Sequence, residues 1–193
     1  MTDTEREGET AAGALVLDFL PHGRTEDDRP QYEKDPLAYA LDTETFALSE
    51  LVVDGDGDGR VSIGDRIDLS GNAAIDRVRG IDYDDLPGGA QSELEYAVAD
   101  LVETEERRFV DFYNDAQPIT LRLHQLDLLP GIGKKIRNDV LDERKRQPFG
   151  SFDDLESRVN GLHNPREVLV ERILEELRED DLKYRTFVRR DGE

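Results

Sequence analysis

Two glycines and two lysines stand close together in the segment Leu129–Lys135. Gly131 and Gly133 omit two Cβ atoms where the chain is expected to reverse, and glycine adopts backbone angles that other residues resist. A helix beginning near Lys134 would start with unpaired N–H groups beside the ammonium groups of Lys134 and Lys135. Because the N-terminus of a helix attracts anions, this spacing predicts a turn that binds phosphate.

Neighbouring residues complete the predicted phosphate site. The full set is Pro130, Gly131, Ile132, Gly133, Lys134, Lys135 and Arg137. Between positions 130 and 146 six basic residues stand against three acidic ones, in a chain whose net charge is −21. Contacts of this kind hold a phosphate backbone without reading bases, so weak sequence specificity is expected. The alternative is a helical hairpin that serves packing or a protein partner.

The segment Asp54–Asp65 has the spacing of a calcium-binding loop, with Asp at its first, third and fifth positions and Gly at its sixth. Its last position is Asp65 rather than the longer Glu, which weakens bidentate ligation. An EF-hand also needs a helix on each side, whereas strands are expected here. We therefore interpret the loop as an acid-rich hairpin turn and expect no metal or cofactor, with calcium binding as a lesser alternative.

Further cations fall in the strand-rich half of the chain, namely Arg60, Arg66, Arg77 and Arg79. Small barrels bind single-stranded nucleic acid through a basic groove with aromatic platforms. Aromatic residues are few in these strands, and acidic residues are many. Two interpretations of these arginines therefore stay open, a contact surface for nucleic acid and simple solvated charge.

The composition excludes several classes of protein. The chain has 193 residues and no Cys, which rules out disulfides and Cys-ligated metal centres. The three histidines lie far apart in sequence, and no P-loop, nucleophile elbow or zinc-water motif occurs, so we expect no enzyme. No apolar run is long enough to cross a membrane and the acidic N-terminus lacks a signal-peptide pattern, so a cytoplasmic location is expected.

The strongly negative charge does not exclude a nucleic-acid partner. The chain carries 46 acidic and 25 basic residues, a balance that resembles proteins of extreme halophiles. A very acidic surface resists association and keeps a protein soluble in salt. At about 1 M salt the screening length is only about 3 Å, so the local charge matters more than the total.

Hydrophobic periodicity predicts strands first and helices afterwards. Strands are predicted at residues 14–20, 37–41, 46–53, 61–69 and 75–83. Helices are predicted at 93–113, 118–126, 134–145, 152–159 and 165–177, with caps at Ser92, Ser151 and Asn164. The order predicts an α+β fold: a tail at 1–12, a small β-barrel at 13–86, an all-α domain at 90–180 and a fraying tail at 181–193.

The segment Leu129–Gly133, followed by a helix, resembles the helix-hairpin-helix signature of many DNA- and RNA-handling proteins. Residues 149–161 resemble the second half of a tandem pair. The first hairpin would then span 128–135 and the second 160–165, where the second glycine of the pattern is missing. In families with such pairs the degenerate hairpin usually completes the fold, so this resemblance implies phosphate binding by the first hairpin.

From about Ala14 to Leu177 the order of segments resembles an uncharacterised archaeal family that joins an OB-like barrel to a tandem helix-hairpin-helix unit. The stretches that carry the resemblance are Leu15–Gly23, Ser92–Leu94, Glu106–Val110 and Pro118–Lys135. The resemblance implies nucleic-acid binding and brings no established activity.

Together these observations predict a non-catalytic protein that holds the phosphate backbone of RNA or DNA, with RNA- or ribosome-related work favoured by the resemblance. The alternative from another class is a halophile adaptor that docks a protein partner. No membrane association is expected. The sequence leaves open the choice between RNA and DNA, and the oligomeric state.

Overall fold

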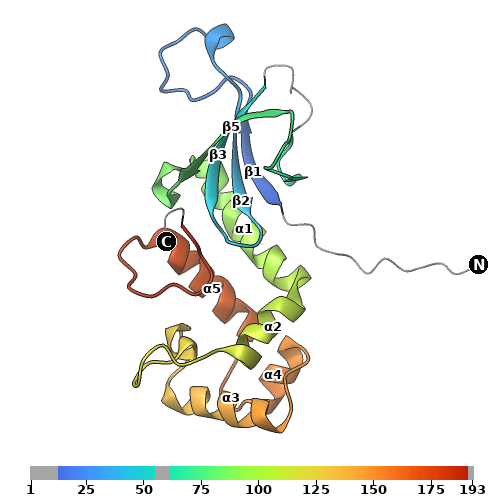
Figure 1. The fold of residues 1–193 in the computed structure, drawn as a ribbon, viewed down its shortest axis with the longest axis vertical. Coiled ribbons are helices and arrows are strands. Elements are labelled where there is room, and N and C mark those ends of the chain that lie inside the picture. The colour runs from blue at the N-terminus through green and yellow to red at the C-terminus, as the bar shows by residue number, and fades with distance from the viewer. Residues whose placement is uncertain (1–12, 55–60, 191–193) are drawn as a thin grey trace, which may run out of the picture. The chain divides into compact units, whose positions relative to one another are not determined.

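The computed structural model describes residues 13–54 and 61–190 (Figure 1). These residues form two compact units. The first unit runs to Ala90 and includes Arg190, and the second comprises Gln91–Arg189. The strands lie in the first unit, and the second unit is predominantly helical.

The strands of the first unit form one five-stranded antiparallel sheet in the order β4-β1-β2-β3-β5. Their bounds are β1 Ala14–Leu20, β2 Leu37–Asp42, β3 Leu48–Val53, β4 Arg66–Ile67 and β5 Ile75–Ile81. The predicted strands at 14–20 and 37–41 are confirmed, and those at 46–53 and 75–83 are confirmed except for two residues at one end of each. The sheet is curled into a half-barrel (Figure 1).

Small and branched side chains form the core of this half-barrel. The cluster comprises Ala14, Val16, Ala38, Ala40, Leu51, Val53, Val61 and Ile67. Its members alternate along each strand because successive side chains of a strand point to opposite faces. Within the described residues the edge strands β4 and β5 do not pair with each other. The sheet is therefore open along that side rather than closed as a barrel.

The predicted strand at 61–69 is wrong for most of its length. Of these residues only Arg66–Ile67 forms a strand of the sheet. Val61 is buried, whereas the side chain of Ile63 lies in solvent with 55% of its surface exposed. Gly64 has a φ of 87°, and the turn there breaks the alternation of inward and outward side chains. The odd positions of the segment consequently do not share one face.

The helices are α1 Gly88–Thr104, α2 Glu106–Asp115, α3 Lys134–Arg146, α4 Phe152–Arg158 and α5 Pro165–Arg178. Short 3-10 helices occur at Gln31–Glu33, Tyr83–Asp85 and Gln125–Leu128, the last labelled η4. The predictions of α3, α4 and α5 are confirmed to within one residue at each end. Among the described helices none is both long and apolar enough to span a membrane.

The predicted helix at 93–113 is two helices. The first, α1, begins at Gly88, so Ser92 lies inside it and is not its N-cap. Glu105, with φ −101° and ψ 36°, leaves the helical conformation and separates α1 from α2. The charged residues between Val102 and Phe109 coincide with this break. The apolar stripe therefore continues across two helices rather than along one.

The predicted helix at 118–126 is absent. Pro118 pairs with His124 in an isolated β-bridge, and the N–H of Ile119 donates to the carbonyl of Leu123. The hydroxyl of Thr120 accepts the N–H of Leu123 and thus competes with helical pairing. The chain forms a small looped hairpin here, and η4 alone precedes the Gly131 turn.

The predicted fraying tail is wrong up to Arg190, the last residue that the structure describes. The carboxylate of Glu176 is fully buried and accepts the N–H groups of Thr186, Phe187 and Val188 at 2.8–3.0 Å. A buried carboxylate requires such partners, and these donors fix the segment after α5 against the helix.

Candidate nucleic-acid interface

The turn between η4 and α3 is built on a left-handed glycine. Gly131 has a φ of 77°, a conformation that favours glycine over every residue with a Cβ. The N–H of Ile132 closes the turn on the carbonyl of Leu129 at 3.2 Å. The side chains of Leu129 and Ile132 are buried beneath it. Leu129 and Ile132 therefore anchor the turn in the core, while the backbone of the turn faces solvent.

Gly133 is the N-cap of α3, with ordinary extended angles of φ −86° and ψ 178°. No protein acceptor in the described chain takes the N–H groups of Gly133, Lys134 or Lys135. A Cβ built on Gly133 would meet nothing within 4 Å. The space in front of this helix end is therefore open, and unpaired N–H groups border it.

Lys134 and Lys135 are exposed in the first turn of α3. No carboxylate within the described residues lies in ion-pair range of either ammonium group. First-turn cations oppose the helix dipole and are mildly unfavourable for the helix itself. An anion held at the same end would reverse that cost.

Arg137, a predicted phosphate ligand, has an internal carboxylate partner in the structure. Its guanidinium donates to both carboxylate oxygens of Asp127, at 2.8 and 3.0 Å, and each side chain is 18% exposed. The second role of Asp127 is to accept the N–H of His124 at 2.8 Å. Arg137 is therefore a positioning residue that fixes η4 against the first turn of α3.

The other basic residues of α3 also have internal partners. Arg144 donates to the carbonyls of Tyr113 and Ala116, at 3.1 and 2.9 Å, and so caps the C-terminal end of α2. Lys145 and Arg146 pair with acidic residues of their own helix, Asp142 and Glu143. Of the basic island predicted between positions 130 and 146, two cations remain for an external anion, Lys134 and Lys135.

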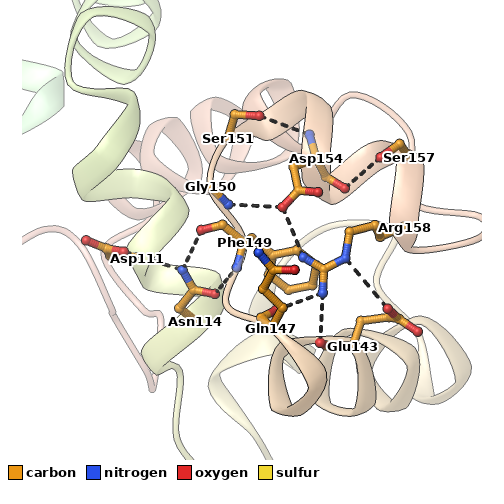
Figure 2. A network of polar contacts seen from close by, with 10 residues as sticks. All are labelled: Asp111, Asn114, Glu143, Gln147, Phe149, Gly150, Ser151, Asp154, Ser157 and Arg158. Atoms are coloured by element: carbon orange, nitrogen blue, oxygen red, sulfur yellow. Dashed lines mark hydrogen bonds and ion pairs between the residues drawn. The ribbon is translucent and has the colours of Figure 1, made fainter.

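Arg158 holds the C-terminal end of α3 in place, a role that the sequence analysis missed (Figure 2). Its guanidinium donates to the carbonyls of Glu143 and Gln147 at 2.8 and 2.7 Å, and to the carboxylate of Asp154 at 3.0 Å. It also stacks on the ring of Phe149 at 4.5 Å. Because Arg158 lies in α4, it links α4 to the end of the helix that carries Lys134 and Lys135.

The second hairpin repeats the backbone of the first. Gly161 has a φ of 88°, and the N–H of Leu162 donates to the carbonyl of Val159 at 3.2 Å, as in the Gly131 turn. Its helix end is different. Asn164 has a left-handed backbone, with a φ of 48°, and its side chain makes no capping hydrogen bond, contrary to the predicted cap. Pro165, which follows it, has no N–H group.

A carboxylate already occupies the end of the second hairpin. Glu156 accepts the N–H of Asn164 at 3.2 Å. The turn is also tied to α2, since the buried hydroxyl of Tyr113 donates to the carbonyl of Pro165 at 2.8 Å. Burial raises the pKa of this hydroxyl well above its ordinary value. The second hairpin therefore links α5 to α2, and it lacks the paired lysines that follow the first hairpin.

His124 caps η4 with its neutral imidazole. Its Nδ1 accepts the N–H of Leu126 at 3.1 Å, and the residue is 7% exposed. Burial lowers the pKa of His124 below its ordinary 6.5, the guanidinium groups of Arg144 and Arg137 lower it further, and Asp127 acts in the opposite direction. Protonation would remove the acceptor from Nδ1, so the folded protein favours the neutral ring.

The wild-type protein should therefore lose stability as the pH falls below about 6.5, because the unfolded chain binds a proton to this ring more readily than the folded one. A His124→Asn variant keeps a capping acceptor that does not titrate. Denaturant unfolding between about pH 7.5 and about pH 5.5 should show a smaller decline for the variant. Equal declines would contradict a neutral, capping His124.

The predicted arginines of the sheet have separate environments. Arg79 pairs with Glu50 across β5 and β3 at 3.3 Å, and Glu50 also binds Arg24. Arg77 is exposed on β5 and has no ion-pair partner among the described residues, while Arg66 lies exposed on β4 at the other edge of the sheet. Arg60 lies outside the described residues. The described arginines thus lie on the two opposite edge strands of the sheet.

Half of the Asp54–Asp65 segment, residues 55–60, lies outside the described residues, which resume at Val61. On its described flanks, β3 ends at Val53 and a turn follows Val61, in which Asp65 accepts the N–H of Ser62 at 2.8 Å. Neither flank is a helix, so the helix–loop–helix frame of an EF-hand is not formed.

A second sequence signal marks the same region as the Gly131 turn. Residues 116–138 contain a single acidic residue, Asp127, although the chain has 46 in 193. Because Asp127 pairs with Arg137, this stretch presents no unpaired carboxylate. The acid-poor stretch could have located the candidate interface from sequence alone.

Comparison with known proteins places the chain in a defined family. Residues 10–189 match the family described as protein of unknown function DUF655, and the chain belongs to this family. It is 38% identical over 180 residues to the uncharacterized protein MJ0038 of Methanocaldococcus jannaschii. The aligned region covers 91% of this chain and 79% of that protein. The crystal structure of Af1531 from Archaeoglobus fulgidus is similar with a TM-score of 0.80 and 35% identity, over 92% of this chain and 99% of the other.

Proposed function

We propose that this protein is a non-catalytic nucleic-acid-binding protein that holds a phosphate group of an RNA or DNA backbone at the N-terminal end of α3. The ligand groups are the N–H groups at Gly133, Lys134 and Lys135 and the two lysine ammonium groups. In this proposal the turn acts in the way expected of a helix-hairpin-helix turn. The half-barrel sheet is compatible with an OB-like domain, and in this proposal it extends the contact or orients the helical unit.

One observation carries the proposal: an open helix end is bordered by N–H groups and by two cations that have no partner among the residues the structure describes. The fold uses the remaining basic residues of α3 for its own contacts and leaves this pair unused. A phosphate oxygen would satisfy the N–H groups and the lysines together, with charge-assisted hydrogen bonds. Such contacts involve no base edges, so affinity should depend weakly on sequence.

The test is binding of the full chain to duplex DNA, single-stranded RNA and structured RNA across a salt series. The Lys134→Gln/Lys135→Gln variant should bind each ligand about tenfold more weakly than the wild type at moderate salt. The dependence of log affinity on log salt should become shallower by about two, since each lysine–phosphate contact releases about one counterion.

A matched control removes the same charge at the other end of the same helix. Lys145→Gln/Arg146→Gln deletes two exposed cations whose partners are Asp142 and Glu143. This control should retain nearly the wild-type affinity and salt slope. The proposal fails if the wild type binds none of the ligands at moderate salt, or if the control loses as much affinity as the lysine variant.

A further inference from the structure

The hairpin loop that precedes η4 exposes a large apolar side chain. Leu121, at the tip of residues 117–125, is fully exposed, with a relative exposure of 107%. Figure 1 draws this loop in yellow, ahead of α3 in the helical unit. A single exposed leucine is common on protein surfaces, so the order and charge of its surroundings decide whether it has a role.

Hydrogen bonds hold the loop in one conformation. The N–H groups of Ile119 and Thr120 both donate to the carbonyl of Leu123, at 2.8 and 3.0 Å. The hydroxyl of Thr120 accepts the N–H groups of Arg122 and Leu123. At the base, the N–H of Gln125 donates to the carbonyl of Gln117 at 3.0 Å. Because the tip is ordered before any partner arrives, little conformational entropy is lost on binding.

The charge around Leu121 favours a polyanion as its partner. Arg122, the next residue, is exposed and has no ion-pair partner among the residues described. From Ala116 to Leu126 the chain has no acidic residue. The loop leads directly into η4, which the Asp127–Arg137 pair fixes to the first turn of α3. The tip and the phosphate-binding turn therefore belong to one fixed segment whose single carboxylate, Asp127, is paired with Arg137.

We propose that Leu121 is a wedge that inserts between bases of the nucleic acid whose phosphate is held at Gly133, while Arg122 contacts the adjacent backbone. This inference rests on the proposed function and extends it from the backbone to a class of substrate. Apolar side chains used in this way unstack one base step, and unstacking is least costly where a base is mismatched or unpaired. The preferred ligand is a duplex with a local defect.

The proposed wedge is tested by comparing the affinity of the protein for matched duplexes with its affinity for duplexes that contain one mismatched pair. The probes are a DNA duplex and the RNA duplex of the same sequence, each with and without one mismatched pair. The wild type should bind the mismatched form several-fold more tightly, and Leu121→Ala should lose this preference while retaining binding to the matched form. Tyr96→Ala, which removes another exposed large side chain of the same unit, should keep the preference.

The absence of tryptophan from the chain allows a direct second readout. Leu121→Trp places a single indole at the tip, and stacking on a base should quench its fluorescence when the mismatched duplex is added. Tyr96→Trp, at a position that is 73% exposed, should show no quenching.

The outcomes separate the two proposals. Binding of the wild type with equal affinity for both duplexes, or with no quenching at position 121, overturns the wedge and leaves the phosphate-binding turn standing. A wild-type preference that Leu121→Ala retains also overturns the wedge. A wild type that binds neither the duplexes nor single strands overturns both.

Discussion

The free energy of unfolding of a Glu176→Gln variant should be about 3 kcal/mol lower than that of the wild type. The amide nitrogen cannot accept two of the four hydrogen bonds that the carboxylate now accepts, and the buried Arg172 loses a negatively charged partner. Glu176 has no exposed surface and accepts four donors, the Nε of Arg172 at 2.9 Å and three backbone N–H groups of residues 186–188. The neutral amide keeps the shape of the side chain, but its nitrogen offers hydrogen atoms where N–H groups already point.

The measurement is denaturant unfolding followed by the helical circular dichroism signal, with a control variant on the same helix. Glu175→Gln removes the other carboxylate that binds Arg172, at 2.7 Å, but Glu175 is 44% exposed. An exposed pair of this kind contributes about 1 kcal/mol or less. Equal stability losses in the two variants would show that burial of Glu176 does not strengthen its contacts.

Substitution of Gly133 by alanine should weaken nucleic-acid binding by about tenfold to a hundredfold and leave the fold almost unchanged. The backbone angles of Gly133 suit any residue, and its Cβ position is empty to 4 Å, so the unfolding free energy should change by less than about 1 kcal/mol. The new methyl group would stand where the phosphate approaches. Loss of one charge-assisted hydrogen bond costs about 1.5–3 kcal/mol of binding free energy.

Gly131→Ala provides the contrasting case in the same turn. Its Cβ would also meet nothing within 4 Å, but its φ of 77° is costly for alanine, by about 1–2 kcal/mol. Gly131→Ala should therefore destabilise the protein, whereas Gly133→Ala should not. If Gly133→Ala binds nucleic acid as well as the wild type, the open space in front of α3 is not where the phosphate binds.

The sequence predicted the elements whose local signals agree with their tertiary contacts. Ser151 caps α4 as predicted, with its hydroxyl accepting the N–H of Asp154 at 3.0 Å, and Pro165 occupies the first position of α5. The Gly131 turn and the beginning of α3 at Lys134 were predicted because glycine spacing and the helical period are both local. Local patterns suffice where no distant group competes.

The failures have non-local causes. The apolar residues at 119–126 suit a helix in isolation, but the pairing of Pro118 with His124 and the Thr120 side chain selects a looped hairpin instead. The charge count around α3 could not distinguish Arg137, whose partner Asp127 lies ten residues earlier. Which cations remain available depends on where the carboxylates and carbonyls lie in the folded chain, and the count does not contain that information.

Three arginines that donate to main-chain carbonyls have a consequence for the behaviour of the protein at high salt. Arg144, Arg158 and Arg172 each donate to main-chain carbonyls, of Ala116, Gln147 and Tyr184 among others, at 2.7–2.9 Å. Dissolved ions weaken the attraction between separated surface charges, but they compete poorly for a short bond between a guanidinium and a neutral carbonyl. At high ionic strength the surface charges of this acidic chain no longer interact with one another. The arginine–carbonyl contacts of the second unit should keep their geometry under the same conditions.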